Sequence, residues 1–200
     1  MIEKYKYDNI YKKHNTFFLK RIIHKNELDV LIKKLNNGKV LDLGVGVGAE
    51  SIYLAKKGFD ITAIDISKFG LIRLQDIAKQ KNLSIRTIVA DLENYVIDEF
   101  YDGIISFYTI QFLNKKRIDS LIKNIKKNTK KGGINIIAVF REGDSTQKKS
   151  NYYFFKDGML KGYYKNWKII SYNEKEILDD NYCKPHIHKI AIVIAENNIT

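Results

Sequence analysis

The sequence is poor in cysteine, in proline and in long apolar runs. One cysteine, Cys183, excludes an internal disulfide framework and a cysteine-rich zinc site. One proline, Pro185, leaves no obvious hinge or proline-rich linker. No run of about eighteen apolar residues occurs, and the N-terminus carries charges where a signal peptide needs its apolar stretch. We therefore expect a cytoplasmic protein with no membrane span.

Lysine, by contrast, is abundant. The 35 Lys and Arg residues outnumber the 23 Asp and Glu residues, for a net charge of +12. Such an excess favours an anionic partner, and nucleic acid is a frequent one. The lysines are spread along the whole chain, and the dense stretch 123–131 resembles the solvated end of a helix, where cations complement the helix dipole. Nucleic acid is thus a conceivable partner but not the favoured one, and the oligomeric state stays open.

Helical and strand patterns alternate along the first 140 residues. Apolar residues at helical spacing predict a helix over 24–35, and a short buried strand follows over 39–43. Ser67 can cap the helix that follows the second strand. The other predicted elements are helices over 49–57, 67–81 and 115–130, the last closing on Gly132-Gly133, and strands over 59–64, 84–89, 101–107 and 133–140.

The pattern changes after residue 144. Strands over 167–173 and 186–195 have no full helix between them, which predicts an antiparallel hairpin at the edge of the sheet. Together with five parallel strands, the hairpin predicts an α/β fold. The expected architecture is a Rossmann-like, doubly wound, seven-stranded and mostly parallel sheet with an antiparallel C-terminal hairpin.

The most informative segment is the glycine-rich turn after the first strand. Gly44, Gly46 and Gly48 stand at alternate positions between a strand and a helix. Glycine lets the backbone approach a ligand closely, and the helix N-terminus offers free amides. The turn therefore predicts a nucleotide-like ligand.

Three carboxylates narrow the choice of nucleotide. The turn satisfies the dinucleotide fingerprint, and Asp65 ends the second strand where a ribose ligand belongs. Asp42, however, stands just before the turn, where it can receive an amino-acid ammonium group that NAD lacks. Asp91 follows the third strand, where it can accept from an adenine amino group while the amide of Leu92 donates to the ring. Because a second mononucleotide-binding half is also absent, a sulfonium cofactor fits better than a dinucleotide.

These features resemble the class I methyltransferase family over about residues 35–140. The resemblance implies S-adenosyl-L-methionine as the cofactor, with Asp65 on the ribose hydroxyls, Asp91 on the adenine amino group and the glycine turn on the methionine portion. Ile66 would pack on the adenine or belong to the ordinary core. The predicted cofactor-binding residues are Asp42, Gly44, Val45, Gly46, Gly48, Asp65, Ile66, Asp91, Leu92 and Ser106.

The C-terminal third is similar to the tellurite-resistance, or TehB-like, methyltransferases. The similarity rests on a Phe-x-x-x-x-Leu pattern, a Tyr-Tyr-x-x-Trp run over 163–167 and a Tyr-Asn-Glu strand end over 172–174. It implies a small acceptor such as tellurite, selenite or a thiol. Residues 179–184 depart from the group, because they lack a His-Arg pair.

We expect one methyltransferase domain over 1–200, with an N-terminal helical or lid segment (1–35), a cofactor-binding core (36–140) and an acceptor-side part (141–200).

The fourth strand ends in Ser-Phe-Tyr-Thr, residues 106–109. Enzymes that methylate base amines usually carry an Asn/Asp-Pro-Pro-aromatic turn there, so base methylation is disfavoured, while other RNA positions stay open. Tyr108 and Thr109 are the nearest polar candidates for orienting the acceptor.

Two rival functions stay open. One is an RNA or other macromolecular methyltransferase, and the other is a non-catalytic S-adenosyl-L-methionine-binding module.

Two histidines begin the last strand. Period-two geometry puts His186 and His188 on one face, but two imidazoles without a third ligand do not predict a metal site. We hypothesise that the two histidines, with Arg141 at the end of the fifth strand, supply positive charge to hold an oxyanion; the alternative is that they are surface residues.

The aromatic N-terminus either covers the cofactor as a lid or packs on the sheet; its aromatic residues are Tyr5, Tyr7, Tyr11, Phe17 and Phe18.

Overall fold

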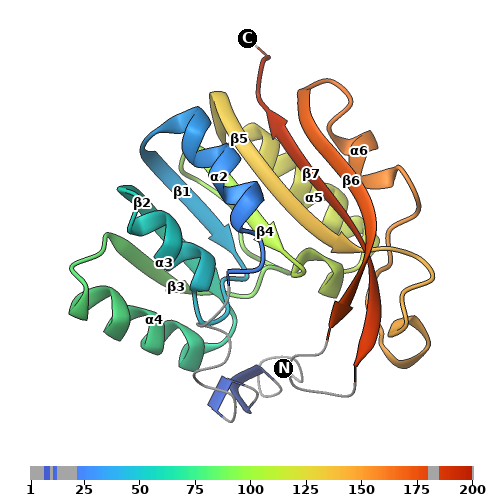
Figure 1. The fold of residues 1–200 in the computed structure, drawn as a ribbon, viewed down its shortest axis with the longest axis horizontal. Helices are drawn as coiled ribbons and strands as arrows, with labels where there is room; N and C mark the ends of the chain where they lie inside the picture. Colours follow the sequence, from blue (N-terminus) through green and yellow to red (C-terminus); the bar gives the residue numbers. More distant parts are fainter. Residues whose placement is uncertain (1–6, 10, 13–21, 180–184, 200) are drawn as a thin grey trace.

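A computed structural model describes residues 7–9, 11–12, 22–179 and 185–199, so that Cys183 lies outside the described residues. Figure 1 shows the elements in sequence colours. No helix among the described residues is long and apolar enough to span a membrane. The elements are α2 (Lys25–Leu35), β1 (Gly38–Leu43), α3 (Ala49–Ala55), β2 (Phe59–Asp65), α4 (Lys68–Gln80), β3 (Ile85–Val89), β4 (Tyr101–Phe107), η2 (Ile110–Phe112), α5 (Lys115–Lys127), β5 (Thr129–Phe140), η3 (Gln147–Lys149), α6 (Met159–Tyr163), β6 (Lys168–Asp179) and β7 (His186–Glu196).

One seven-stranded sheet has the strand order β3-β2-β1-β4-β5-β7-β6. Strands β1 to β5 are parallel, and β7 runs antiparallel between β5 and β6. The predicted mostly parallel sheet with an antiparallel C-terminal hairpin is confirmed, with β6 at the edge. The strand order reverses between β1 and β4, and in sheets of this type ligands bind at the carboxyl ends of the strands beside that reversal.

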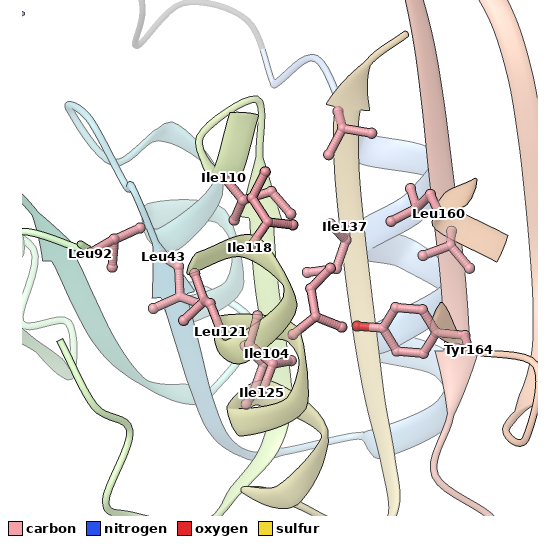
Figure 2. Packing of buried hydrophobic residues seen from close by; sticks show 14 of the residues in the cluster. Leu43, Leu92, Ile104, Ile110, Ile118, Leu121, Ile125, Ile137, Leu160 and Tyr164 are labelled. Carbon is pink, nitrogen blue, oxygen red and sulfur yellow. The ribbon is translucent and has the colours of Figure 1, made fainter. Parts of the chain in front are cut away.

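Helices cover both faces of the sheet (Figure 1). Figure 2 shows Ile118, Leu121 and Ile125 of α5 in the core on one face, together with Ile104 of β4. The next residue along β4, Ile105, belongs to the core on the other face, with α2, α3 and α4. Strands covered on both sides need apolar residues at successive positions, as at 104–105 in β4 and 136–140 in β5.

The second crossover helix begins as predicted. The side chain of Ser67 accepts a hydrogen bond from the amide of Gly70, so that it caps α4. Asn114 caps α5 in the same way by accepting from the amide of Arg117.

The fifth strand begins earlier than predicted, and α5 ends earlier. The helix ends at Asn128, and the Thr129 hydroxyl donates back to Ile125 O over 2.8 Å. The Tyr101 amide donates to Asn128 O, so pairing with β4 starts before the glycines. Gly132 therefore lies in a register irregularity of the strand rather than at a helix terminus, because cross-strand pairing outweighs the local helix-stop signal.

We predict that Ile104→Ala lowers the free energy of unfolding by roughly 2–5 kcal/mol, since the side chain is fully buried in the central strand. Ile72→Ala is the matched control, because Ile72 is 47% exposed and its loss should change stability by less than about 0.5 kcal/mol. Urea unfolding followed by circular dichroism measures both. Equal losses would contradict the assignment of the core.

Candidate active site

The glycine turn is held in a conformation that only glycine adopts easily. Gly44, Gly46 and Gly48 have φ values of 80°, 59° and 88°. A Cβ at Gly44 would lie 2.1 Å from the Thr109 Oγ1, and one at Gly48 would lie 2.4 Å from a methyl carbon of Leu74. The turn thus needs glycine both for its backbone angles and for its contacts with α4 and with the segment that follows β4.

Asp65 joins the turn to the start of α4. Its carboxylate accepts from the amides of Gly46 and Ser67, each over 2.8 Å, and is 7% exposed. Burial raises the pKa of Asp65. A carboxylate has about four acceptor positions, so its bonds to backbone amides leave room for a further donor.

Asp42 is a buried carboxyl group just before the turn. It is 3% exposed and accepts a hydrogen bond of 2.7 Å from the Ser51 hydroxyl. Burial raises the pKa of Asp42 to about 8, and the nearby carboxylates Glu50 and Asp65 add to the shift. No cation pairs with Asp42 among the described residues. A positively charged ligand group would therefore be stabilised beside it.

The carboxyl ends of β1 to β4 enclose a cavity of about 330 Å³. Of the residues predicted from the sequence, the cavity is lined by Gly44, Asp65, Ile66, Asp91, Leu92, Tyr108 and Thr109. Behind this lining lie Asp42, Val45, Gly46, Gly48 and Ser106, which support the turn or the strands. The lining also contains Tyr7 and Tyr11 of the predicted lid, together with Ala90, Glu93, Phe107, Phe112 and Leu113, which the sequence analysis did not select.

Ser106 has a supporting position rather than a place in the lining. It is fully buried, and its hydroxyl donates to Leu43 O over 3.0 Å. This bond ties the end of β4 to the end of β1.

The short helix η2 brings Phe112, and Leu113 directly after it, to the cavity lining. No periodic pattern in the sequence predicts the direction of this helix.

The described part of the N-terminal segment lies against the turn. The Asp8 carboxylate accepts from the Ser67 hydroxyl and from the Phe69 amide at the start of α4. The Tyr7 ring lies 5.5 Å from the Phe112 ring, and a Cβ at Gly46 would lie 2.8 Å from the Tyr11 hydroxyl. Of the other aromatic residues predicted to form a lid, Tyr5, Phe17 and Phe18 lie outside the described residues.

Tyr108, which the sequence predicts to orient the acceptor, has an unusual backbone conformation. It has a φ of 52°, which a bulky residue rarely adopts, and its ring stacks on Phe140 at 5.2 Å. Its hydroxyl is buried without a hydrogen-bond partner among the described residues. Burial, followed by the field of nearby carboxylates such as Glu27 and Glu50, raises the pKa of this phenol. A buried hydroxyl without a partner is costly, so the site is suited to a ligand that supplies one.

The other residues proposed for the acceptor lie outside the cavity lining. The Arg141 guanidinium pairs with Asp157 and, at 3.3 Å, with Glu174, and its Nε donates to a backbone carbonyl. His186 and His188 face one another on β7. Because carboxylates already neutralise Arg141, little of its charge is left for an oxyanion, and its contact with the acceptor stays a prediction.

The comparisons with known proteins agree with this geometry. The family described as "Tellurite resistance protein TehB" matches residues 5–180. The chain belongs to the TehB family. A TehB relative from Haemophilus influenzae, named "Probable S-adenosyl-L-methionine-dependent methyltransferase TehB", is 37% identical over 170 residues. The match covers 84% of this chain and 58% of the relative, so the chain spans less than two thirds of that relative's length.

Solved structures place the TehB fold among the class I methyltransferases, as predicted. The crystal structure of TehB from Haemophilus influenzae has a TM-score of 0.80 at 33% identity and covers 96% of this chain and 67% of the other. N-methyltransferase NodS from Bradyrhizobium japonicum, in complex with S-adenosyl-L-homocysteine, has a TM-score of 0.71 at 16% identity and covers 88% and 86%. The second likeness shows the fold alone.

The raised pKa of Asp42 predicts a pH-dependent stability. Because the pKa is raised in the folded state, from 3.8 to about 8, this group favours folding below about pH 4, and its contribution is lost as the pH rises through about 8. We expect Asp42→Asn to flatten the fall in the free energy of unfolding between pH 5 and pH 8.5. Urea unfolding at both values tests this, with the exposed Asp76→Asn as control. The same slope in Asp42→Asn and in the unsubstituted protein would contradict it.

Proposed function

We propose that the chain is an S-adenosyl-L-methionine-dependent methyltransferase that acts on a small, soft or anionic acceptor such as tellurite, selenite or a thiol. The observation that carries the proposal is the convergence of Gly44, Asp65 and Asp91 on one cavity, with Tyr108 and Thr109 in the same lining. The name of the Haemophilus influenzae TehB relative supports the same cofactor and reaction.

The residues of the cavity fit the cofactor. Asp65 keeps acceptor positions for ribose hydroxyls, and Asp91 lies at the end of β3, where it can accept from the adenine amino group. Ile66 and Leu92 supply apolar contacts for the base. Asp42 lies behind the lining and is kept largely protonated at neutral pH by its burial; from there, its carboxyl group would favour the cofactor's ammonium group at the turn.

The chain needs to position the reactants and exclude water more than it needs to activate them. Bound S-adenosyl-L-methionine supplies a methyl group that its positive sulfur already activates. The turn and the carboxylates hold the cofactor, while Tyr7 and Tyr11 close the cavity against water. A soft acceptor attacks with its own lone pair, so that Tyr108 and Thr109 orient it and no general base is required.

The charge distribution favours a small acceptor over nucleic acid. Lysines at the end of α5 and at the start of β5 line a surface hollow of about 580 Å³ together with Trp167; they are Lys126, Lys127, Lys130 and Lys131. This hollow lies at the amino end of β5, whereas the cofactor cavity lies at the carboxyl ends of the parallel strands. A polyanion bound to these lysines would lie at the wrong end of the sheet for methyl transfer.

We expect the purified chain to release S-adenosyl-L-homocysteine when it is given S-adenosyl-L-methionine with tellurite, selenite or a small thiol. Release with bulk RNA alone, weakening steeply with salt, would replace the proposal by a macromolecular methyltransferase. Tight cofactor binding without turnover on any acceptor would indicate a binding module.

Tyr108→Phe is expected to lower kcat/KM for the acceptor roughly tenfold to a hundredfold, because a hydrogen bond to a charged group is lost. The dissociation constant for S-adenosyl-L-methionine should stay unchanged. Tyr153→Phe is the matched control, since its hydroxyl donates to the Met159 sulfur over 3.5 Å and the residue lies outside the cavity lining. Steady-state kinetics and isothermal titration calorimetry separate the two effects, and unaltered kinetics in Tyr108→Phe would remove this residue from the acceptor site.

Asp8→Ala is expected to weaken cofactor binding roughly fivefold, because the N-terminal segment loses the bonds that fasten it to the start of α4. The exposed neighbour Asn9→Ala should bind as the unsubstituted chain does. Calorimetric titration with S-adenosyl-L-methionine gives both constants. If Asp8→Ala binds normally, the segment does not act as a lid.

A further inference from the structure

The open end of the β6–β7 hairpin gathers three side chains with metal-binding atoms. Asp179 ends β6 and is the cross-strand partner of His186, which begins β7. Residues directly opposite one another in an antiparallel pair point to the same face, and so do residues two apart in one strand. His188 therefore shares this face with both.

The distances suit a shared ion. The two imidazole Nε2 atoms lie 3.0 Å apart, and the Asp179 Oδ2 lies 3.7 Å from the His188 Nε2. One ligand atom from each of the three residues lies within 4.8 Å of the others. Zinc binds imidazole nitrogen at about 2.0–2.1 Å, so an ion at that distance from both Nε2 atoms would see them at an angle of roughly 90°.

A fourth residue sets the orientation of His188. The His188 Nδ1 lies 3.0 Å from the Asp144 Oδ2. Asp144 is itself fixed, because it accepts from the amides of Lys189 and Thr146 over 2.9 and 2.8 Å. An ionised carboxylate only accepts, so in the neutral imidazole the hydrogen is on Nδ1 and the lone pair of Nε2 points toward the other two ligands. In many metal sites a carboxylate accepts a hydrogen bond from the second ring nitrogen of a metal-bound histidine and so fixes its orientation.

Packing fixes the buried His188 side chain, while the site stays accessible from solvent. The His188 ring stacks on Phe140 at 4.3 Å with an interplanar angle of 10°. His188 is buried, whereas Asp179 and His186 are partly exposed. An ion can therefore reach ligands whose positions change little on binding.

We propose that Asp179, His186 and His188 form a binding site for a divalent transition-metal ion of the zinc type, oriented by Asp144. Two imidazoles with one carboxylate favour such ions over magnesium or calcium, which prefer oxygen ligands. The ion joins the ends of β6 and β7, and three protein ligands leave a coordination position for water or an anion. The site does not depend on the methyl transfer proposed above.

The sequence analysis predicts no metal here because it finds two histidines and no third ligand. The hairpin register supplies that ligand by bringing Asp179 opposite His186. The contact between Asp144 and His188, which are 44 residues apart in the chain, likewise exists only in the folded protein.

The test is a titration of the tag-free, metal-stripped full chain with zinc chloride by calorimetry, in parallel with cobalt chloride followed by visible absorption. We expect one ion per chain, cobalt absorption bands that saturate at one equivalent, and a melting temperature that rises with zinc. His186→Ala and Asp179→Asn should lose this binding, and Asp144→Asn should weaken it roughly tenfold to a hundredfold. Glu176→Gln, an exposed carboxylate on the same hairpin, is the matched control and should bind as the unsubstituted chain does.

Two results would overturn the site. One is the absence of stoichiometric zinc binding by the unsubstituted chain; the other is equal affinity in the unsubstituted chain and His186→Ala. Circular dichroism shows whether each variant is folded. Because His186 is more exposed than His188, its replacement keeps the test decisive even if substitutions at the buried Asp144 or His188 unfold the chain.

Discussion

The parallel pairing of β1 with β4 is the interaction on which the rest of the molecule depends. These neighbours send their crossover helices to opposite faces of the sheet, so their carboxyl ends are left uncovered. The Ser106 hydroxyl fastens the two ends together through Leu43 O, and Gly44 lies against Thr109. The glycine turn and the residues proposed to orient the acceptor thus meet at the ends of two neighbouring strands.

This end of the sheet concentrates buried carboxyl groups in a strongly basic protein. Asp42 and Asp65 are buried, and burial raises the pKa of each, as it does for Glu50. Ionisation of a buried carboxyl group is unfavourable when no cation is near. A positively charged ligand at this site would therefore stabilise the ionised form. The net charge of +12 says nothing of this local field, because the lysines lie mostly on the solvated faces.

The inserted strand β7 joins the hairpin to Tyr108 through aromatic contacts. It places His188 against Phe140 at 4.3 Å, and Phe140 in turn stacks on Tyr108 at 5.2 Å. The aromatic rings therefore form a continuous row from the histidines at the open end of the hairpin to the lining of the cavity. Direct ring contacts thus join the hairpin to Tyr108.

Local patterns in the sequence determined the order of the elements, the glycine turn with Asp65 and Asp91, and the family likeness, because each depends on residues near one another in the chain. The tertiary structure decided which predicted residues reach the cavity: Asp42 and Ser106 support it from behind. It also decided that Gly132 lies within a strand and that Asp179 joins the two histidines. Strand register and crossover direction fix these neighbours, and both arise from pairing between distant segments that no local periodicity records.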